Sequence, residues 1–266
     1  MTATARPSAT QQARPARAGA GWLRCRQPRP HARVRLVCLP HAGGSAGAFR
    51  AWSAHLPESV ELHAVQYPGR EDRYHEPAVT DLHRLADLVA GALIPLLDRP
   101  LALFGHSMGA IVAHETALRL HRRGTPLSHL FLSGQPAPGH RQGGTVHLGD
   151  DDTLVSELRR LGGTRQDALD DPELRAIVLP AVRADYQAVE TYRPANDAPL
   201  SCPITAFVGT EDPEATVPET RDWASQTTGP FDLRALPGGH FYLTDHTATV
   251  ATDVARRLGT PWPDLP

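Results

Sequence analysis

Residues 101–120 read Leu-Ala-Leu-Phe-Gly-His-Ser-Met-Gly-Ala-Ile-Val-Ala-His-Glu-Thr-Ala-Leu-Arg-Leu, and this stretch decides the fold. The apolar run Leu101–Phe104 leads into a Gly-x-Ser-x-Gly sequence, and a helical pattern follows from Met108 to Leu120. This motif requires a strand, a sharp turn and a helix, because side chains two residues before and after the central serine would collide in the turn, and glycine has none. The turn is predicted to lift the Ser107 oxygen clear of a sheet.

Short apolar runs alternate with helical patterns on both sides of this motif. Strands that are apolar throughout and interleaved with helices are typical of a parallel sheet covered on both faces. The sequence therefore predicts an α/β fold. The expected strands are 34–39, 60–65, 101–104, 130–132, 204–208 and 231–236, and the expected helices are 49–56, 80–97 (N-cap Thr80 or Asp81) and 108–120.

One segment interrupts the alternation. Residues 136–199 contain no convincing strand but have helical patterns at 153–161 and 172–192. Helices inserted between strands of such a sheet often cover the site at the strand ends, so we expect a lid here, with plain helical decoration as the alternative. The expected division is a core of residues 21–135 and 200–266 around this insertion. Residues 1–20 have no apolar periodicity, and no acidic residue precedes Glu58, so a disordered basic tail is expected rather than a docking arm.

Composition excludes several classes of protein. The 266 residues carry 27 basic and 29 acidic side chains, a formal charge of −2, so no basic field indicates nucleic acid. No apolar run reaches the roughly 18–20 residues of a membrane span. The chain contains no lysine, which removes Schiff-base and phosphate-loop chemistry. The cysteines, Cys25, Cys38 and Cys202, have neither a disulfide framework nor metal-ligand spacing, and Cys38 lies in an apolar run. With no recognisable secretory signal, a cytoplasmic protein is expected.

A serine nucleophile needs a base, and a base needs an orienting acid. His240 is the best candidate base among the 14 histidines, because it stands on a Gly-Gly loop directly after the strand-like run Phe231–Leu236. Asp212 follows the apolar run that ends at Val208 and precedes His240, the chain order of an α/β-hydrolase. Glu211 is the local alternative to Asp212. A Ser107–His240–Asp212 triad is therefore predicted.

An oxyanion also needs two donors. The backbone N–H of Met108 begins the helix after Ser107, and Pro40-His41-Ala42-Gly43-Gly44 directly follows the first core strand. The N–H groups of Ala42 and Met108 are the predicted oxyanion hole. His41 is interpreted as a structural hydrogen-bonding residue rather than a substrate contact, and His106 as a packing residue. The Gly-Gly pair lacks the arrangement of a phosphate loop.

Several motifs together resemble the type II (external, editing) thioesterases of polyketide and nonribosomal peptide biosynthesis, over about residues 22–258. The motifs are Pro40–Gly44 followed by Phe49 and Trp52, then Gln66-Tyr67-Pro68-Gly69-Arg70, Gly105–Gly109, Gly209-x-x-Asp212 and Gly238-Gly239-His240-Phe241. The resemblance implies an α/β-hydrolase fold with a mostly parallel sheet, the triad and oxyanion donors named above, and a helical lid that shapes an acyl pocket. It adds nothing about residues 1–20.

The resemblance also implies a function. Such an enzyme hydrolyses aberrant or stalled acyl groups from the phosphopantetheine arms of acyl or peptidyl carrier domains, through an acyl-serine intermediate. Neither a metal nor an organic cofactor is expected, nor a nucleic-acid or membrane partner, and a monomer is expected. Three alternatives remain open: a carboxylesterase, an acyltransferase with the same triad, and an inactive carrier-protein binder.

Overall fold

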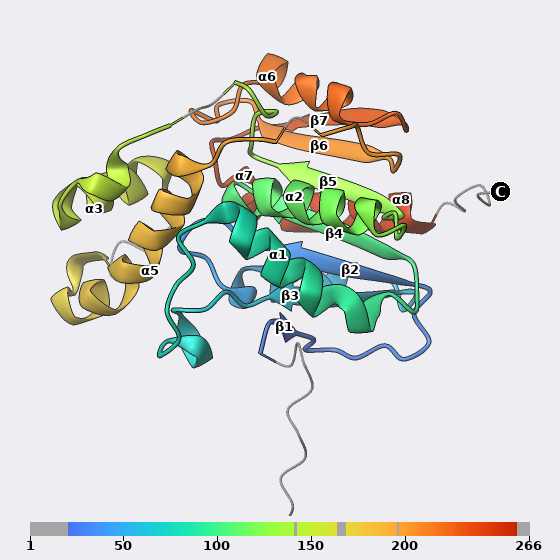
Figure 1. Cartoon of the computed structure of the whole chain (residues 1–266), viewed down its shortest axis with the longest axis horizontal. Helices are drawn as coiled ribbons and strands as arrows, with labels where there is room; N and C mark the ends of the chain where they lie inside the picture. The colour runs from blue at the N-terminus through green and yellow to red at the C-terminus, as the bar shows by residue number, and fades with distance from the viewer. Residues whose placement is uncertain (1–20, 141–142, 164–168, 196, 260–266) are drawn as a thin grey trace, which may run out of the picture.

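A seven-stranded sheet forms the centre of the molecule (Figure 1). The computed structural model describes residues 21–140, 143–163, 169–195 and 197–259. The strand order is β1-β3-β2-β4-β5-β6-β7, and every neighbouring pair is parallel except β1 with β3. The strands are β1 (Leu23–Arg24), β2 (Val34–Leu39), β3 (Val60–Val65), β4 (Leu101–His106), β5 (His129–Ser133), β6 (Ile204–Gly209) and β7 (Phe231–Leu236).

The α-helices connect these strands or extend beyond them. They are α1 (Leu82–Leu93), α2 (Met108–Arg122), α3 (Asp151–Leu161), α5 (Pro172–Thr191), α6 (Val217–Arg221), α7 (Tyr242–Asp245) and α8 (Thr247–Gly259). Short 3₁₀ turns are η1 (Ala46–Phe49), η2 (Trp52–His55), η3 (Glu71–Arg73), η4 (Ile94–Leu96), η5 (Val146–Leu148) and η6 (Asp222–Gln226). No helix in the described ranges is both long enough and apolar enough to cross a membrane.

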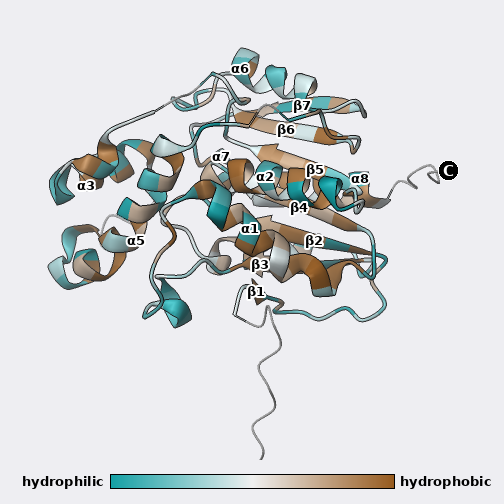
Figure 2. Ribbon diagram, viewed as in Figure 1, coloured by the Kyte–Doolittle hydropathy of each residue, from teal (hydrophilic) through white to brown (hydrophobic). Residues whose placement is uncertain are grey.

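Each face of the sheet buries its own hydrophobic cluster. Alternate residues of β2 point to opposite faces, so Val37 packs with α1 and α2 whereas Leu36 packs with η1, η2 and α8. Figure 1 accordingly shows α1 and α2 in front of the sheet and α8 behind it. The strands β4, β5 and β6 are predominantly brown in Figure 2 because both of their faces are covered. The mostly parallel, doubly covered sheet confirms the predicted α/β fold.

Most of the helical insertion, as we call residues 136–199, lies beyond these two layers, although Ala137 and Ala188 pack in the cluster with α1 and α2. Figure 1 shows α3 and α5 at one side, beyond the end toward which the arrows of β2 and β5 point. These helices share a third, smaller cluster that includes Leu154, Leu158, Leu179 and Val182. Asp150 and Asp171 cap their N-termini by accepting backbone N–H groups. The insertion therefore has its own small core.

Most predicted elements are present, with differences at their ends. The predicted helix 49–56 is replaced by the 3₁₀ turns η1 and η2. The predicted helix 80–97 begins after Asp81, which caps it, and changes to the 3₁₀ turn η4 at Ile94 because Pro95 has no N–H to continue the helix. Cys38 is fully buried, as predicted. The predicted tail, residues 1–20, lies outside the described residues.

The start of α2 and the end of β2 approach each other too closely for a side chain. A Cβ at Gly109 would lie 2.1 Å from the carbonyl oxygen of Leu39. Gly109→Ala is therefore expected to lower the free energy of unfolding by about 1–3 kcal/mol, because backbone must shift to admit one methyl group. Urea denaturation monitored by circular dichroism measures this change.

Gly91 provides the matched control, since it lies within α1 and a Cβ there would meet nothing within 4 Å. Gly91→Ala is expected to raise the free energy of unfolding by about 0.5–1 kcal/mol. Equal effects of the two substitutions would contradict the close approach of α2 to β2.

Candidate active site

Ser107 occupies a strained turn between β4 and α2. Its backbone angles, φ 54° and ψ −123°, lie in a region that residues other than glycine rarely adopt. Ser133 holds the turn, because its carbonyl accepts the Ser107 N–H at 2.8 Å. A Cβ at Gly105 would lie 2.1 Å from the carbonyl oxygen of Gly109, so both glycines of the motif are sterically required. The turn leaves Ser107 partly exposed at the carboxyl end of β4.

His240 and Asp212 meet Ser107 at this end of the sheet. The Nε2 atom of His240 lies 2.9 Å from the Ser107 Oγ, and its Nδ1 lies 2.9 and 3.0 Å from the two carboxylate oxygens of Asp212. Asp212 also accepts the backbone N–H of Glu214 at 2.8 Å, and both His240 and Asp212 are buried. Glu211, the alternative acid, is exposed. The structure thus brings the three predicted residues together in one hydrogen-bonded chain.

The two predicted oxyanion donors flank the same point. Ala42 follows the end of β2, and Met108 is the first residue of α2. The register pairs Leu39 of β2 with Gly105 of β4, which places the loop after β2 beside the turn at Ser107. Both residues line the same cavity as Ser107 and His240. The N-terminus of α2 also directs its positive dipole end toward this position.

A cavity of about 230 Å³ opens from Ser107 and His240 between the sheet and the helical insertion. The core contributes one wall, and α3, α5 and the segment around η5 contribute the other. The larger share of its lining is apolar, which suits a hydrocarbon chain, and Glu157, Glu190 and Glu214 add carboxylates to the wall. The apolar lining residues include Ile111, Ala137, Val146, Leu158, Leu161, Tyr186, Val189, Trp223 and Phe241.

His106 is buried and His41 is partly buried near His240, and neither is hydrogen-bonded to it. The His106 ring lies 5.2 Å from the His240 ring, and its Nδ1 lies 2.9 Å from the Ser133 Oγ, which in turn lies 2.6 Å from the Tyr242 hydroxyl. Burial, together with the charges of His240 and His41, holds the pKa of His106 well below its usual value. Burial and the neighbouring positive charges of His240 and Arg70 lower the pKa of His41 to about 4. Both rings are therefore neutral near pH 7, and His41 also lines the cavity that holds Ser107 and His240.

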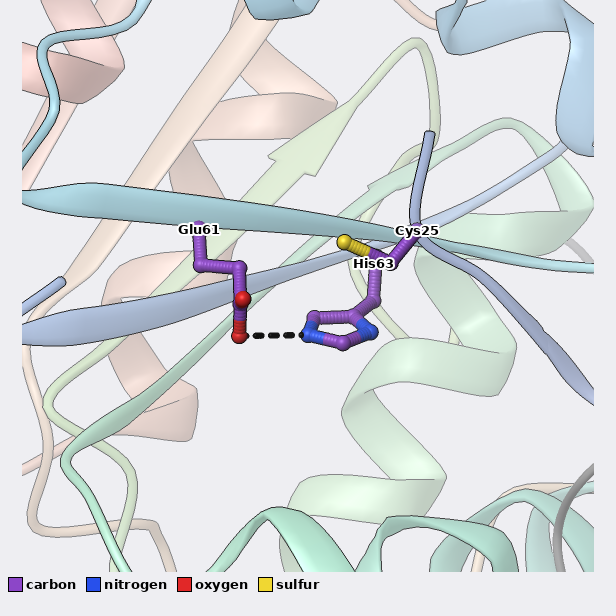
Figure 3. A group of neighbouring side chains, drawn as sticks. All are labelled: Cys25, Glu61 and His63. Carbon is purple, nitrogen blue, oxygen red and sulfur yellow. Dashed lines mark hydrogen bonds and ion pairs between the residues drawn. The ribbon is translucent and has the colours of Figure 1, made fainter. Parts of the chain in front are cut away.

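A cysteine, a glutamate and a histidine gather at the β1 edge of the sheet (Figure 3). The ligand atoms of Cys25, Glu61 and His63 lie within 4.8 Å of one another. The Glu61 carboxylate is already occupied, since it accepts the Arg29 N–H at 2.8 Å and the Arg35 Nε at 3.2 Å and lies 3.0 Å from the His63 Nε2. Arg35 thus supplies the cation that the carboxylate needs. We interpret the group as an ion-pair network that fixes the edge strand, and none of its three residues lines the cavity.

Three residues near the site are absent from the sequence-based predictions. Ser133 and Tyr242 support His106, and Asp185 of α5 accepts the backbone N–H of Gly43 at 2.7 Å. The sequence carries no signal for Asp185, because its partners lie 115 and 142 residues away. Tyr242 stands two residues after His240, so proximity along the chain could have indicated it.

The fold and the site define the class of protein, an α/β-hydrolase with a serine, a histidine and an aspartate joined at the carboxyl ends of the strands. The thioesterase domain family matches residues 34–258. The chain belongs to this family and is a hydrolase that acts on thioesters.

Several similar proteins are themselves thioesterases. Thioesterase PikA5 of Streptomyces venezuelae is 46% identical over 89% of this chain and 85% of its own length. The probable cadicidin biosynthesis thioesterase of Streptomyces griseus is also 46% identical, over 90% of this chain and 66% of its own length, just under two thirds. The solved structure of the type II thioesterase BorB, from the borrelidin biosynthetic cluster, superimposes with a TM-score of 0.83 at 45% identity, covering 89% of this chain and 97% of BorB.

His114 of α2 makes the stability of the fold dependent on pH. It is buried, both ring nitrogens lack a hydrogen-bond partner among the described residues, and its ring packs edge-on against Trp223. Burial lowers the pKa of His114 from 6.5 to about 4. His114 therefore binds a proton more readily in the unfolded chain than in the folded chain. The folded state keeps its full stability above about pH 6.5 and loses part of it as the pH falls toward 4.

Replacing His114 removes its contribution to the pH dependence of stability. Between pH 7 and pH 5, the free energy of unfolding of the wild type is expected to fall by about 1–2 kcal/mol more than that of His114→Phe. Urea denaturation at the two pH values measures the difference. The exposed His75 serves as the control, since His75→Gln should retain the wild-type dependence. Parallel losses in His114→Phe and the wild type would contradict the assignment.

Proposed function

We propose that the chain hydrolyses acyl groups from phosphopantetheine thioesters on the carrier domains of polyketide and nonribosomal peptide synthases, removing aberrant or stalled chains. The observation that carries the proposal is the hydrogen-bonded sequence Ser107–His240–Asp212 at the mouth of an apolar cavity. The related PikA5 and BorB, a thioesterase and a type II thioesterase, support this substrate class.

In the proposed first step, the Ser107 Oγ attacks the thioester carbonyl carbon. Its proton passes to the His240 Nε2, which lies 2.9 Å away. Asp212 holds the Nδ1–H of His240, so that Nε2 is free to accept the proton, and stabilises the imidazolium that forms. The N–H groups of Ala42 and Met108 donate to the oxyanion.

The tetrahedral intermediate then collapses to an acyl-serine. The carbon–sulfur bond breaks, and the pantetheine sulfur leaves with the proton from His240. A water molecule next attacks the acyl carbonyl and gives its proton to His240. Collapse of this second intermediate returns the proton to Ser107 and releases the carboxylic acid. The neutral state of His41 and His106 supports His240 as the group that carries the proton.

The helical insertion is proposed to act as a lid that shapes the acyl pocket. Leu158 of α3 and Val189 of α5 line the cavity opposite Ser107. α3 and the first part of α5 share their own cluster, whereas Ala188 near the end of α5 packs in the cluster on the sheet, so a lid movement would turn about the end of α5. The residues of α3 and α5 that line the cavity are proposed to set the length and branching of the acyl chain that fits.

Acyl and peptidyl carrier domains are the proposed partners, without nucleic acid or membrane. All the residues of the proposed mechanism come from one chain, which supports action as a monomer. The free thiols of Cys25, Cys38 and Cys202 support a cytoplasmic location.

Ser107→Ala tests the proposed nucleophile. The substitution removes the attacking oxygen and is expected to lower kcat for hydrolysis of butyryl-pantetheine by a factor of about 10³ or more. Thiol release measures the reaction, and a fluorophosphonate probe should label the wild type but not the variant. Retention of full activity by Ser107→Ala would refute the assignment.

Asp212→Asn tests the orienting acid. An amide cannot hold His240 in the tautomer that accepts the serine proton, so kcat should fall by a factor of about 10² to 10⁴. Glu211→Gln changes the adjacent exposed carboxylate and is the matched control, with activity near that of the wild type. A loss below about threefold in Asp212→Asn, with a large loss in Glu211→Gln, would transfer the role to Glu211.

A further inference from the structure

A buried ion pair joins the helical insertion to the loop that carries Ala42. The Nη1 and Nη2 atoms of Arg70 donate to the two carboxylate oxygens of Asp185 at 2.6 and 2.8 Å. Asp185 lies in α5 and is 2% exposed, and Arg70 follows β3 and is 8% exposed. Because both oxygens are engaged and solvent is excluded, the pair has one fixed geometry.

Both members of the pair also bind the oxyanion loop, as we call residues 40–45. The Asp185 Oδ2 accepts the Gly43 N–H at 2.7 Å, and the Arg70 Nη1 donates to the Gly44 carbonyl at 3.1 Å. Within the loop, the Gly44 N–H donates to the His41 carbonyl at 2.9 Å. The His41 carbonyl and the Ala42 N–H belong to the same planar peptide unit. The ion pair therefore fixes the two residues that follow Ala42, and the turn they form fixes the peptide unit of the Ala42 N–H.

The packing around Gly43 supports the same arrangement. Gly43 has a φ of +75°, and a Cβ there would lie 2.8 Å from the Cγ2 of Val182, one turn before Asp185 on α5. The loop and the helix thus touch through both an apolar and a charged contact. Neither contact can persist if α5 moves away from the loop.

We propose that Asp185 is a positioning residue, which orients the Ala42 N–H toward the oxyanion only while α5 is docked on the loop. This inference rests on the oxyanion role proposed for Ala42. Arg70 makes the arrangement compatible with catalysis, because an unpaired carboxylate at this loop would repel the negative charge of the tetrahedral intermediate. Docking of the insertion and completion of the oxyanion hole are then one event.

Asp185→Asn tests the proposal with little change in shape. The amide cannot accept two Arg70 donors and the Gly43 N–H together, so the loop loses its fixed geometry. We expect kcat for butyryl-pantetheine to fall by a factor of about 10 to 100, less than the loss of a whole oxyanion donor, with KM changed less than about threefold. A purely structural role would not separate kcat from KM in this way.

Two ligands of equal chain length provide the decisive comparison. A trifluoromethyl ketone analogue of butyryl-pantetheine forms a tetrahedral oxyanion adduct with Ser107, whereas the S-butyl thioether of pantetheine has no carbonyl at the position that Ser107 attacks and reports ground-state binding. In Asp185→Asn, ketone affinity should fall by the same factor as kcat/KM, and thioether affinity should change less than about twofold. Equal losses of both affinities, or a kcat within threefold of the wild type, would overturn the proposal.

Arg183→Gln is the matched control on the same helix. Arg183 bonds the carbonyls of His147 and Gly149 and pairs with Asp151, all within the insertion. The ratio of ketone affinity to thioether affinity in Arg183→Gln should equal that of the wild type. If Asp185→Asn does not fold, Arg70→Lys gives the same readout, because a lysine cannot form the two-pronged pair. A selective loss of ketone affinity there supports the proposal, and an unchanged ratio overturns it.

Failure of the proposed function would look different. If the wild type hydrolyses p-nitrophenyl butyrate but not butyryl-pantetheine, the proposed carrier-thioester substrate is wrong. The effect of Asp185→Asn on kcat for the ester then still reports whether α5 positions the oxyanion loop.

Discussion

The backbone of Ser107 is the constraint on which the rest of the site depends. Holding a serine at φ 54° and ψ −123° costs about 1–3 kcal/mol, so the surrounding structure must enforce it. The Ser107 N–H donates to the Ser133 carbonyl, which ties the serine backbone to β5. The close contacts of Gly105 and Gly109 tie it to β4 and α2. Because a larger residue at either glycine would collide with backbone, the position of the serine oxygen is fixed before any other site residue is considered.

Parallel strands bring the remaining groups to this oxygen. Ala42, Ser107, Asp212 and His240 follow β2, β4, β6 and β7 respectively, and the carboxyl ends of parallel strands lie at one edge of the sheet. Ser107 and His240, which lie 133 positions apart along the chain, therefore meet without any long excursion of the loops. The apolar strands create this edge, and the polar residues just beyond each strand carry the chemistry.

This division explains what could be predicted from the sequence. Val34–Leu39, Val60–Val65 and Phe231–Leu236 have the bounds that their residue patterns predict. The hydrogen-bonded meeting of Ser107, His240 and Asp212 also follows from motifs placed after such runs. The two-residue strand β1 is too short to give a pattern, and α8 is missing from the predictions although Val250 and Val254 stand at helical spacing. Asp185 could not be found, because a buried charge within a helix becomes interpretable only when Arg70 and Gly43 are seen beside it.

The Arg70–Asp185 pair is better explained by its positioning of the oxyanion loop than by a contribution to the stability of the fold. A buried ion pair often contributes little net stability, because the cost of removing two charges from water offsets their attraction. Separating such a pair without solvating both members is nevertheless costly, so the pair opposes any movement of α5 away from the oxyanion loop. Asp185 joins the insertion to this loop through the Gly43 N–H. In the proposed arrangement, the contact that holds α5 against the oxyanion loop also completes the donors above Ser107, which would tie the chemistry to the presence of an enclosed substrate.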